Sequence, residues 1–312
     1  MSASPADDPL GAEGRLEPEL DWSAFEPGRR FPAVPLALDD AQVDAYLEAT
    51  GESHPLYERG GLAPPLMSTM VRLVKASLGG RWPSGTVQLD HRIAMHRALR
   101  RGERLWIDAR VTRAWQRNGR SYYELVSELC DGEGARVGLQ SSTSMWAGAL
   151  APGTRTAGPG LDGGAREVKP AAQAPALEAP ALTALGPLQQ AYPLTALRAF
   201  GRVAGALDPI HVDEAFGRGT RWGVNIAQGR LVMTLLSRLL LARHGRRFLD
   251  GHDLQVRFVA PVPVGMSVTA RGWLQDIDPC DLVLRCDDPS GRPVITGRVR
   301  LGEPSGRWPD DH

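Results

Sequence analysis

The chain has 312 residues, 42% of them hydrophobic, and its 36 Lys and Arg residues balance 36 Asp and Glu residues. This length allows one large domain or two domains of ordinary size. A balanced charge creates no global field that would attract nucleic acid or an anionic membrane, so we expect neither partner. Three cysteines without paired spacing argue against a disulfide framework and against a zinc site.

Residues 1–30 are rich in Pro, Gly and acidic residues and lack apolar periodicity, which predicts a flexible N-terminal tail. They also lack the apolar stretch of a signal peptide. The most apolar segment, LVMTLLSRLLLA, is too short to span a bilayer and contains Arg238. We therefore expect a cytoplasmic protein without a membrane-spanning helix.

Two halves of the chain, residues 31–147 and 188–304, repeat the same order of features. Each half has a short helical segment, a turn, a long apolar helix and then several strands. The segment between them, residues 148–187, is dominated by Ala, Gly and Pro and is expected to be a linker. Residues 305–312 are expected to be a short C-terminal tail.

Periodicity supports these expected elements. Alternation of Leu254, Val256 and Phe258 predicts a strand, and the segments CDGEGAR and DDPSGRP predict hairpin turns at matching places in the halves. A similar helix is expected in the first half from Leu66 to Leu78. The second-half helix has one wide apolar face, formed by Leu231, Val232, Leu235, Leu236, Leu239 and Leu240. The expected fold class is α+β, a long helix wrapped by an antiparallel sheet and repeated twice, which is a double hotdog.

The second half contains the tract Ala206-Leu-Asp-Pro-Ile-His-Val-Asp213, and the tetrapeptide Gln228-Gly-Arg-Leu231 opens its long helix. These motifs resemble the MaoC-like family of (R)-specific enoyl-CoA hydratases and β-hydroxyacyl thioester dehydratases. The family pattern is roughly S-G-D-x-N-P-I-H-x-D, followed by a loop and H-G-x-L. The resemblance extends over both halves and implies a double hotdog enzyme of fatty acid metabolism.

The resemblance implies a lyase that interconverts enoyl and 3-hydroxyacyl thioesters of coenzyme A or an acyl-carrier protein. This chemistry needs a base, an acid and donors to the thioester oxygen, but neither a metal nor another cofactor, because the thioester itself activates the substrate. His211 matches the family's acid/base, and the Gly229 N–H at the helix start matches its oxyanion donor. Asp208 stands at the family's Asn position. The expected substrate-binding residues are Gln228, Arg230, Asp213 and Tyr57.

The chain departs from the family pattern at the acid, where Ala206 stands in place of Asp, and at Gln228, which replaces His. Three accounts of the missing acid stay open. Asp208 has taken over its role, another carboxylate enters the site, or the hydration chemistry is lost. The carboxylates considered for the second account are Asp213, Glu214 and Glu52.

The first half aligns with the same turn. It has Glu52 at the acid position, His54 at the Asn position and Tyr57 at the His position. Since Tyr57 cannot replace the histidine, and the resemblance implies an acyl-chain pocket in this half, we expect the first half to be non-catalytic.

Two other functions are alternatives to the hydratase or dehydratase. A non-catalytic acyl-thioester-binding or accessory protein would explain the loss of the acid at Ala206. A hotdog thioesterase fits less well, because such enzymes usually carry a carboxylate on the long helix, and residues Gly229–Gly245 include no Asp or Glu. A monomer and a homodimer of double hotdogs are both compatible with the sequence.

Overall fold

The computed structural model describes residues 19–59, 61–80, 82, 86–146, 184–275 and 278–302. We call residues 19–146 the first repeat and residues 184–302 the second repeat. The first repeat contains, in chain order, η2 (Trp22–Phe25), β1 (Arg30–Ala37), α1 (Asp40–Thr50), η3 (Pro55–Tyr57), β2 (Leu62–Ala63), η4 (Pro65–Thr69), α2 (Val71–Leu78), β3 (Thr86–Met95), β4 (Leu99–Arg100), β5 (Arg104–Arg117), β6 (Arg120–Cys130) and β7 (Arg136–Trp146).

The second repeat follows the same plan with a longer central helix. It contains β8 (Ala184–Ala191), α3 (Leu194–Ala204), α4 (Pro209–Val212), α5 (Glu214–Gly219), α6 (Gly229–His244), α7 (Arg246–Asp250), β9 (His252–Phe258), β10 (Ser267–Gln275), β11 (Asp278–Asp287) and β12 (Pro293–Leu301).

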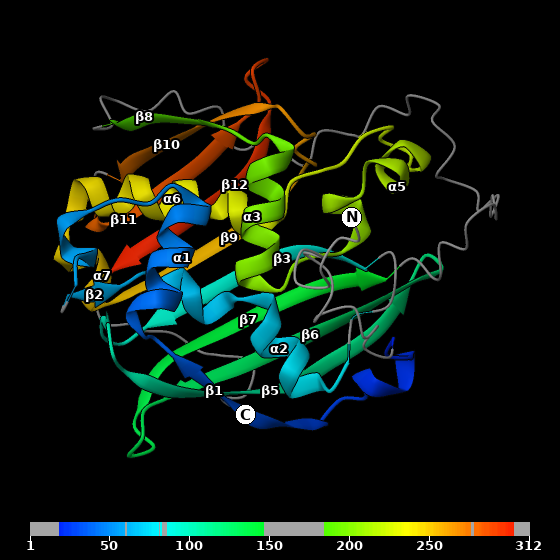
Figure 1. The fold of residues 1–312 in the computed structure, drawn as a ribbon, viewed down its shortest axis with the longest axis horizontal. Helices are drawn as coiled ribbons and strands as arrows, with labels where there is room; N and C mark the ends of the chain where they lie inside the picture. Colours follow the sequence, from blue (N-terminus) through cyan, green and yellow to red (C-terminus); the bar gives the residue numbers. More distant parts are fainter. Residues whose placement is uncertain are drawn as a thin grey trace, which may run out of the picture.

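Within the described residues, ten strands form one sheet in the order β1-β5-β6-β7-β3-β9-β12-β11-β10-β8. Each repeat contributes one half of this order, and β3 pairs antiparallel with β9 at the centre. Figure 1 shows this long sheet running through both halves of the molecule, with α6 against the second half and α2 against the first. The chain therefore has the expected α+β double hotdog fold.

The seam between the repeats is both apolar and charged. Ile93 pairs with Leu254 across β3 and β9, and their exposed fractions are 1% and 0%. Arg92 holds Asp253 in a two-pronged ion pair, with Nε–Oδ1 and Nη2–Oδ2 distances of 2.9 and 2.6 Å. Such bidentate pairs fix geometry as well as adding attraction, so they set how the two half-sheets meet.

The expectation of similar long helices in both repeats is wrong. Helix α6 has 16 residues, whereas the matching part of the first repeat is a short 3-10 segment, η4, and then α2 with 8 residues. The chain turns out of helical geometry at Met70, where ψ is 130°. Side chains bind the carbonyls before this break, since Gln140 Nε2 donates to Ser68 O and Arg230 Nη1 donates to Thr69 O. These carbonyls thus have partners other than the helix amides that would otherwise bond them.

Two expected domain boundaries also need correction. Residues 1–18 lie outside the described part of the chain, but Trp22–Phe25 form a helical turn rather than a flexible tail. Phe25 is 1% exposed and stacks on Tyr123 with a ring-centroid distance of 4.1 Å, because its aromatic surface gains from burial. The expected linker reaches too far, since β8 begins at Ala184 and pairs with β10. Most of that linker and the tail from residue 305 lie outside the described residues.

The strand alternation and both hairpin turns appear where expected, at β9, β6–β7 and β11–β12. Cys130, Cys280 and Cys286 are free thiols. In the part of the chain that the structure describes, no helix is long and apolar enough to cross a bilayer. A cytoplasmic location and a homodimer stay predictions.

Candidate active site

The turn from Gly205 to Asp213 follows α3 and carries the sequence-predicted catalytic residues. Gly205 ends α3 in the left-handed region with φ of 71°, as glycine readily does. Pro209 occupies the first turn of α4, where its missing N–H costs nothing. Asp208 precedes α4 and makes no capping hydrogen bond with its side chain, so its carboxylate is not committed to the helix end.

Asn225, which the sequence analysis did not single out, binds this turn to the segment that leads into α6. Its side-chain Nδ2 donates to the carbonyls of Pro209, Ile210 and Asp213 at 3.3, 3.1 and 2.8 Å. Asn225 is 2% exposed, so these bonds are made away from water. The Asn225 amide therefore adds a side-chain donor to three carbonyls that already accept backbone amides, and it fixes the turn against the segment that leads into α6.

His211 lies on α4 and is anchored by the same segment. Its Nδ1 is 2.8 Å from the carbonyl oxygen of Ile226. A carbonyl only accepts, so Nδ1 carries the proton and, in the neutral ring, Nε2 presents a lone pair. Burial is the main cause that lowers the pKa of His211, although the Ile226 hydrogen bond and the Asp208 charge oppose it. A neutral imidazole with an unprotonated Nε2 is the form that can accept a proton at pH 7.

Among the described carboxylates, Asp208 is the one that raises the pKa of His211 through its charge. The other acids considered from the sequence are committed elsewhere. Asp213 is exposed and caps α5 by accepting from Ala215 N and Phe216 N. Glu214 is exposed and pairs with Arg198 at 3.6 Å. Asp208 is thus the described carboxylate whose charge acts on His211, and its role in place of the acid missing at Ala206 stays a prediction.

Gly229 is the first residue of α6, and its amide has no partner among the described backbone and side-chain acceptors. Such orphan amides at a helix N-terminus attract negative charge. The glycine also has a packing reason, because a Cβ would come within 2.8 Å of the Phe258 ring. A thioester oxygen could therefore approach this helix start without a side chain at Gly229 in the way.

Gln228 lies beneath the turn instead of facing a substrate. It is 3% exposed, and its Nε2 donates to Leu197 O and Ala206 O at 2.9 and 3.2 Å. Ala206 is also 3% exposed. Gln228 therefore ties the turn to the start of α6, and its expected contact with substrate is replaced by a positioning role.

Arg230 is half-buried and bonds to the first repeat. Its Nη1 donates to Thr69 O, and its Nε donates to Gln88 Oε1 at 3.3 Å. Burial lowers the pKa of its guanidinium to about 10. The expected contact of Arg230 with substrate is untested by these bonds and stays a prediction.

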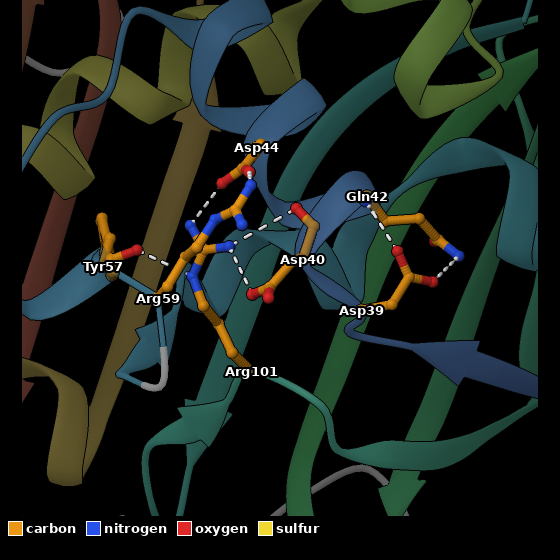
Figure 2. A network of polar contacts seen from close by, with 7 residues as sticks. All are labelled: Asp39, Asp40, Gln42, Asp44, Tyr57, Arg59 and Arg101. Atoms are coloured by element: carbon orange, nitrogen blue, oxygen red, sulfur yellow. Dashed lines mark hydrogen bonds and ion pairs between the residues drawn. The ribbon is translucent and has the colours of Figure 1, made fainter.

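The matching turn of the first repeat is buried. Tyr57 is 2% exposed, and its hydroxyl has no hydrogen-bond partner among the described residues. Glu52 is 4% exposed and both carboxyl oxygens lack partners, so burial raises its pKa to about 8. Figure 2 shows how Arg101 fixes this turn, donating to Tyr57 O at 2.8 Å and pairing with Asp40 and Asp44 at 3.0 and 2.7 Å.

Lys75 is a second residue that the sequence analysis missed. It lies on α2 in the first repeat, yet its positive charge helps to lower the pKa of His211 in the second. Nearby, a Cβ added to Gly205 would meet the backbone of Arg72 at 2.9 Å, so the turn that carries His211 packs against α2. No local motif signals either contact, because both depend on how the repeats pair.

Comparison with known proteins bears on the same half of the chain. Residues 179–283 match the family model described as MaoC like domain. The second repeat is therefore similar to a MaoC-like domain. No curated protein matches the chain significantly.

Solved structures match the whole double hotdog that contains this repeat. A MaoC-like dehydratase is 18% identical, with a TM-score of 0.69 over 94% of this chain and 99% of that one. A MaoC-like dehydratase from Phytophthora capsici is 16% identical, with a TM-score of 0.64 over 92% of this chain and 100% of that one. A hypothetical protein of Mycobacterium tuberculosis with a double hotdog fold is 18% identical, with a TM-score of 0.58 over 89% and 97% of the two chains. At these identities the similarity supports the fold alone.

Proposed function

We propose that the protein is a hydratase or dehydratase that interconverts enoyl and 3-hydroxyacyl thioesters. The observation that carries the proposal is the neutral His211, whose Nδ1 is bonded to Ile226 O in the segment that begins α6. This bond leaves Nε2 free as a base beside the helix start whose Gly229 amide lacks a partner. Addition of water to a conjugated thioester requires a base, an acid and an oxyanion donor; His211 can serve as base and then as acid, and the Gly229 amide can serve as donor.

In hydration, His211 Nε2 takes a proton from water as the oxygen adds to the β-carbon of the enoyl thioester. Negative charge then grows on the thioester oxygen, where the Gly229 N–H and the dipole of α6 stabilise it. The protonated His211 then gives this proton to the α-carbon, which restores the neutral imidazole, and dehydration follows the same steps in reverse. Asp208 stabilises the imidazolium formed in the first step, since its negative charge raises the pKa of His211.

Coenzyme A and an acyl-carrier protein are both suitable carriers of this thioester, because the reacting atoms are the same in each. Fatty acid metabolism is the corresponding cellular context. Asp213 and Tyr57 are not part of this proposal, since the first caps α5 and the second is buried in the first repeat.

The test is turnover of crotonyl-CoA, followed as loss of the conjugated enoyl absorbance. We expect His211→Ala to lower kcat by about 10²–10⁴-fold, the usual contribution of a general base. The matched control is His54→Asn in the equivalent turn. His54 Nδ1 accepts from Leu56 N, and Asn can preserve such a cap, so activity should be unchanged. Equal activity of His211→Ala and wild type would refute the proposal.

A second candidate function is a non-catalytic binder of acyl thioesters. Ala206, buried where the family pattern has its acid, favours it. Calorimetry separates the two, because a binder would bind crotonyl-CoA and butyryl-CoA without converting the first. Absence of turnover across short, medium and branched enoyl thioesters, with binding retained, would decide for the binder.

A further inference from the structure

A small cavity lies between α2 and strands β3, β6 and β7, next to the first turn of α6. Polar groups from both repeats line it: Arg230, His91, Gln140, Ser127, Ser141 and Ser142. As the side chains stand, the space among them holds about one water molecule. A polar cavity of this kind within a hotdog core needs a reason, because burying polar groups costs free energy unless they are paired.

The guanidinium of Arg230 brings a positive charge to this cavity without a matching negative one. Its recorded partners are the neutral oxygens of Thr69 and Gln88. Among the described residues, no carboxylate lies within ion-pair distance of it. Arg230 is half-buried, and a guanidinium whose partners are neutral oxygens can still bind an anion.

A series of hydrogen bonds begins at Arg230, and in it each side chain donates to the next group. Arg230 Nε donates to Gln88 Oε1, and Gln88 Nε2 donates to His91 Nδ1 at 2.7 Å. His91 Nε2 then donates to Gln140 Oε1 at 3.1 Å, and Gln140 Nε2 donates to Ser68 O at 3.0 Å. Burial lowers the pKa of His91 to about 3, so the ring stays neutral. This series of hydrogen bonds orients amide and imidazole dipoles, but none of its members is an anion.

Donors remain available at the cavity. The hydroxyls of Ser127, Ser141 and Ser142 make no recorded hydrogen bond to other described residues, and hydroxyls can donate or accept as a ligand demands. Together with the unneutralised guanidinium, they form a lining suited to a negatively charged oxygen. Neutral apolar groups would leave these donors unpaired.

The cavity is next to the proposed reaction site, because Arg230 follows Gly229 directly in α6. A thioester oxygen at the Gly229 amide would place its acyl chain beside the root of the Arg230 side chain. We propose that the cavity receives a carboxylate on the acyl group, so that the preferred substrates are thioesters of dicarboxylic acids. This rests on the proposed function for where the thioester lies, but its test measures binding alone.

A phosphate of coenzyme A is a less suitable occupant. A phosphate is tetrahedral and strongly hydrated, whereas this space holds about one water and lies under α2. A carboxylate needs to place only one oxygen at the guanidinium to gain a charge-assisted hydrogen bond. Free coenzyme A, which has the phosphates and no acyl group, separates the two sources in the experiment.

The experiment is calorimetry with saturated thioesters, which cannot be hydrated. Succinyl-CoA and glutaryl-CoA are compared with butyryl-CoA and valeryl-CoA, which match them in carbon number, and with free coenzyme A. The measurement is repeated in His211→Ala, so that failure of catalysis does not affect it. We expect one of the dicarboxylic thioesters to bind at least about 10-fold more tightly than its neutral counterpart, equivalent to about 1.4 kcal/mol.

Arg230→Gln should abolish this preference while leaving the affinity for butyryl-CoA nearly unchanged, and Arg230→Lys should keep part of it. Arg243→Gln, an exposed position on the same helix, is the matched control and should keep all of it. Equal binding of both classes by the wild type would overturn the proposal even if Arg230→Gln failed to fold. If Arg230→Gln weakened the binding of dicarboxylic and neutral thioesters equally, Arg230 would have a structural role and the proposal would fail. If Arg230→Gln weakened the binding of free coenzyme A, the cavity would bind a phosphate and the proposal would also fail.

Discussion

The two turns after α1 and α3 occupy equivalent places in the repeats but differ in chemistry. The first turn buries Glu52 and Tyr57, whose side-chain oxygens have no hydrogen-bond partner among the described residues. The second turn has a small buried side chain, Ala206, and leaves His211 with a free ring nitrogen. Both turns are bound firmly to their surroundings, by Arg101 in the first repeat and Asn225 in the second. The two repeats therefore share a scaffold, and the turns differ in their ionisable groups, Glu52 in the first and His211 in the second.

The largest expected effect concerns the buried acid of the first turn. Burial raises the pKa of Glu52 from 4.5 to about 8, so the folded protein keeps a proton that the unfolded chain releases. Stability should therefore fall as pH rises from about 4.5 to 8, by an amount on the order of 5 kcal/mol. Glu52→Gln should remove this slope in urea unfolding across pH 5–9. Glu48→Gln, an exposed change on α1, should keep the slope.

If the slope of Glu52→Gln matched that of the wild type, Glu52 would be paired with a group that keeps it ionised. The first turn would then hold a charged acid, and the contrast between the repeats would disappear.

The second effect concerns the acid of the turn that carries His211. Asp208→Asn should lower kcat by about 100-fold, because the charge that favours protonated His211 is lost. Adding Ala206→Asp to this variant recreates the family pattern and should restore part of the activity. Asp250→Asn, exposed on α7, is the control. Full activity in Asp208→Asn would show that this carboxylate takes no part in the reaction.

The smallest effect concerns the glycines that end α1 and α3. Both have positive φ, 67° at Gly51 and 71° at Gly205, so alanine is strained at each by about 1 kcal/mol. A Cβ at Gly205 would also meet Arg72 backbone atoms at 2.9 Å, whereas at Gly51 the nearest is Arg238 Nη1 at 3.8 Å. Gly205→Ala should thus cost about 2–3 kcal/mol in denaturant unfolding and Gly51→Ala about 1 kcal/mol. Equal costs would mean that the packing of the two turns is equivalent.

The fold could be predicted well because its signals are local. The alternation at Leu254, Val256 and Phe258 and the Gly-rich hairpin turns determine strands from neighbouring residues alone. The break at Met70 could not be predicted. It depends on Gln140 and Arg230, which are far from it in sequence and bind carbonyls that a helix would otherwise use.

Some residues of the candidate site could also be predicted from local sequence, and others could not. His211 and Gly229 follow from a short motif that resembles a known family. The bonds of Arg230 to the first repeat and the influence of Lys75 on His211 arise where one repeat meets the other. Gln228 is buried by contacts within the second repeat, with Leu197 O and Ala206 O. Sequence periodicity contains no information on these contacts, because the partners are far apart in the sequence.

The pairing of β3 with β9 makes one covalent chain out of what a homodimer would build from two identical subunits. In a symmetric dimer every substitution occurs twice, at both copies of a site. In this chain a mutation changes one turn and leaves the other untouched. One turn can therefore hold a buried acid while the equivalent turn holds a histidine, and a substitution at Arg230 is made once in each molecule.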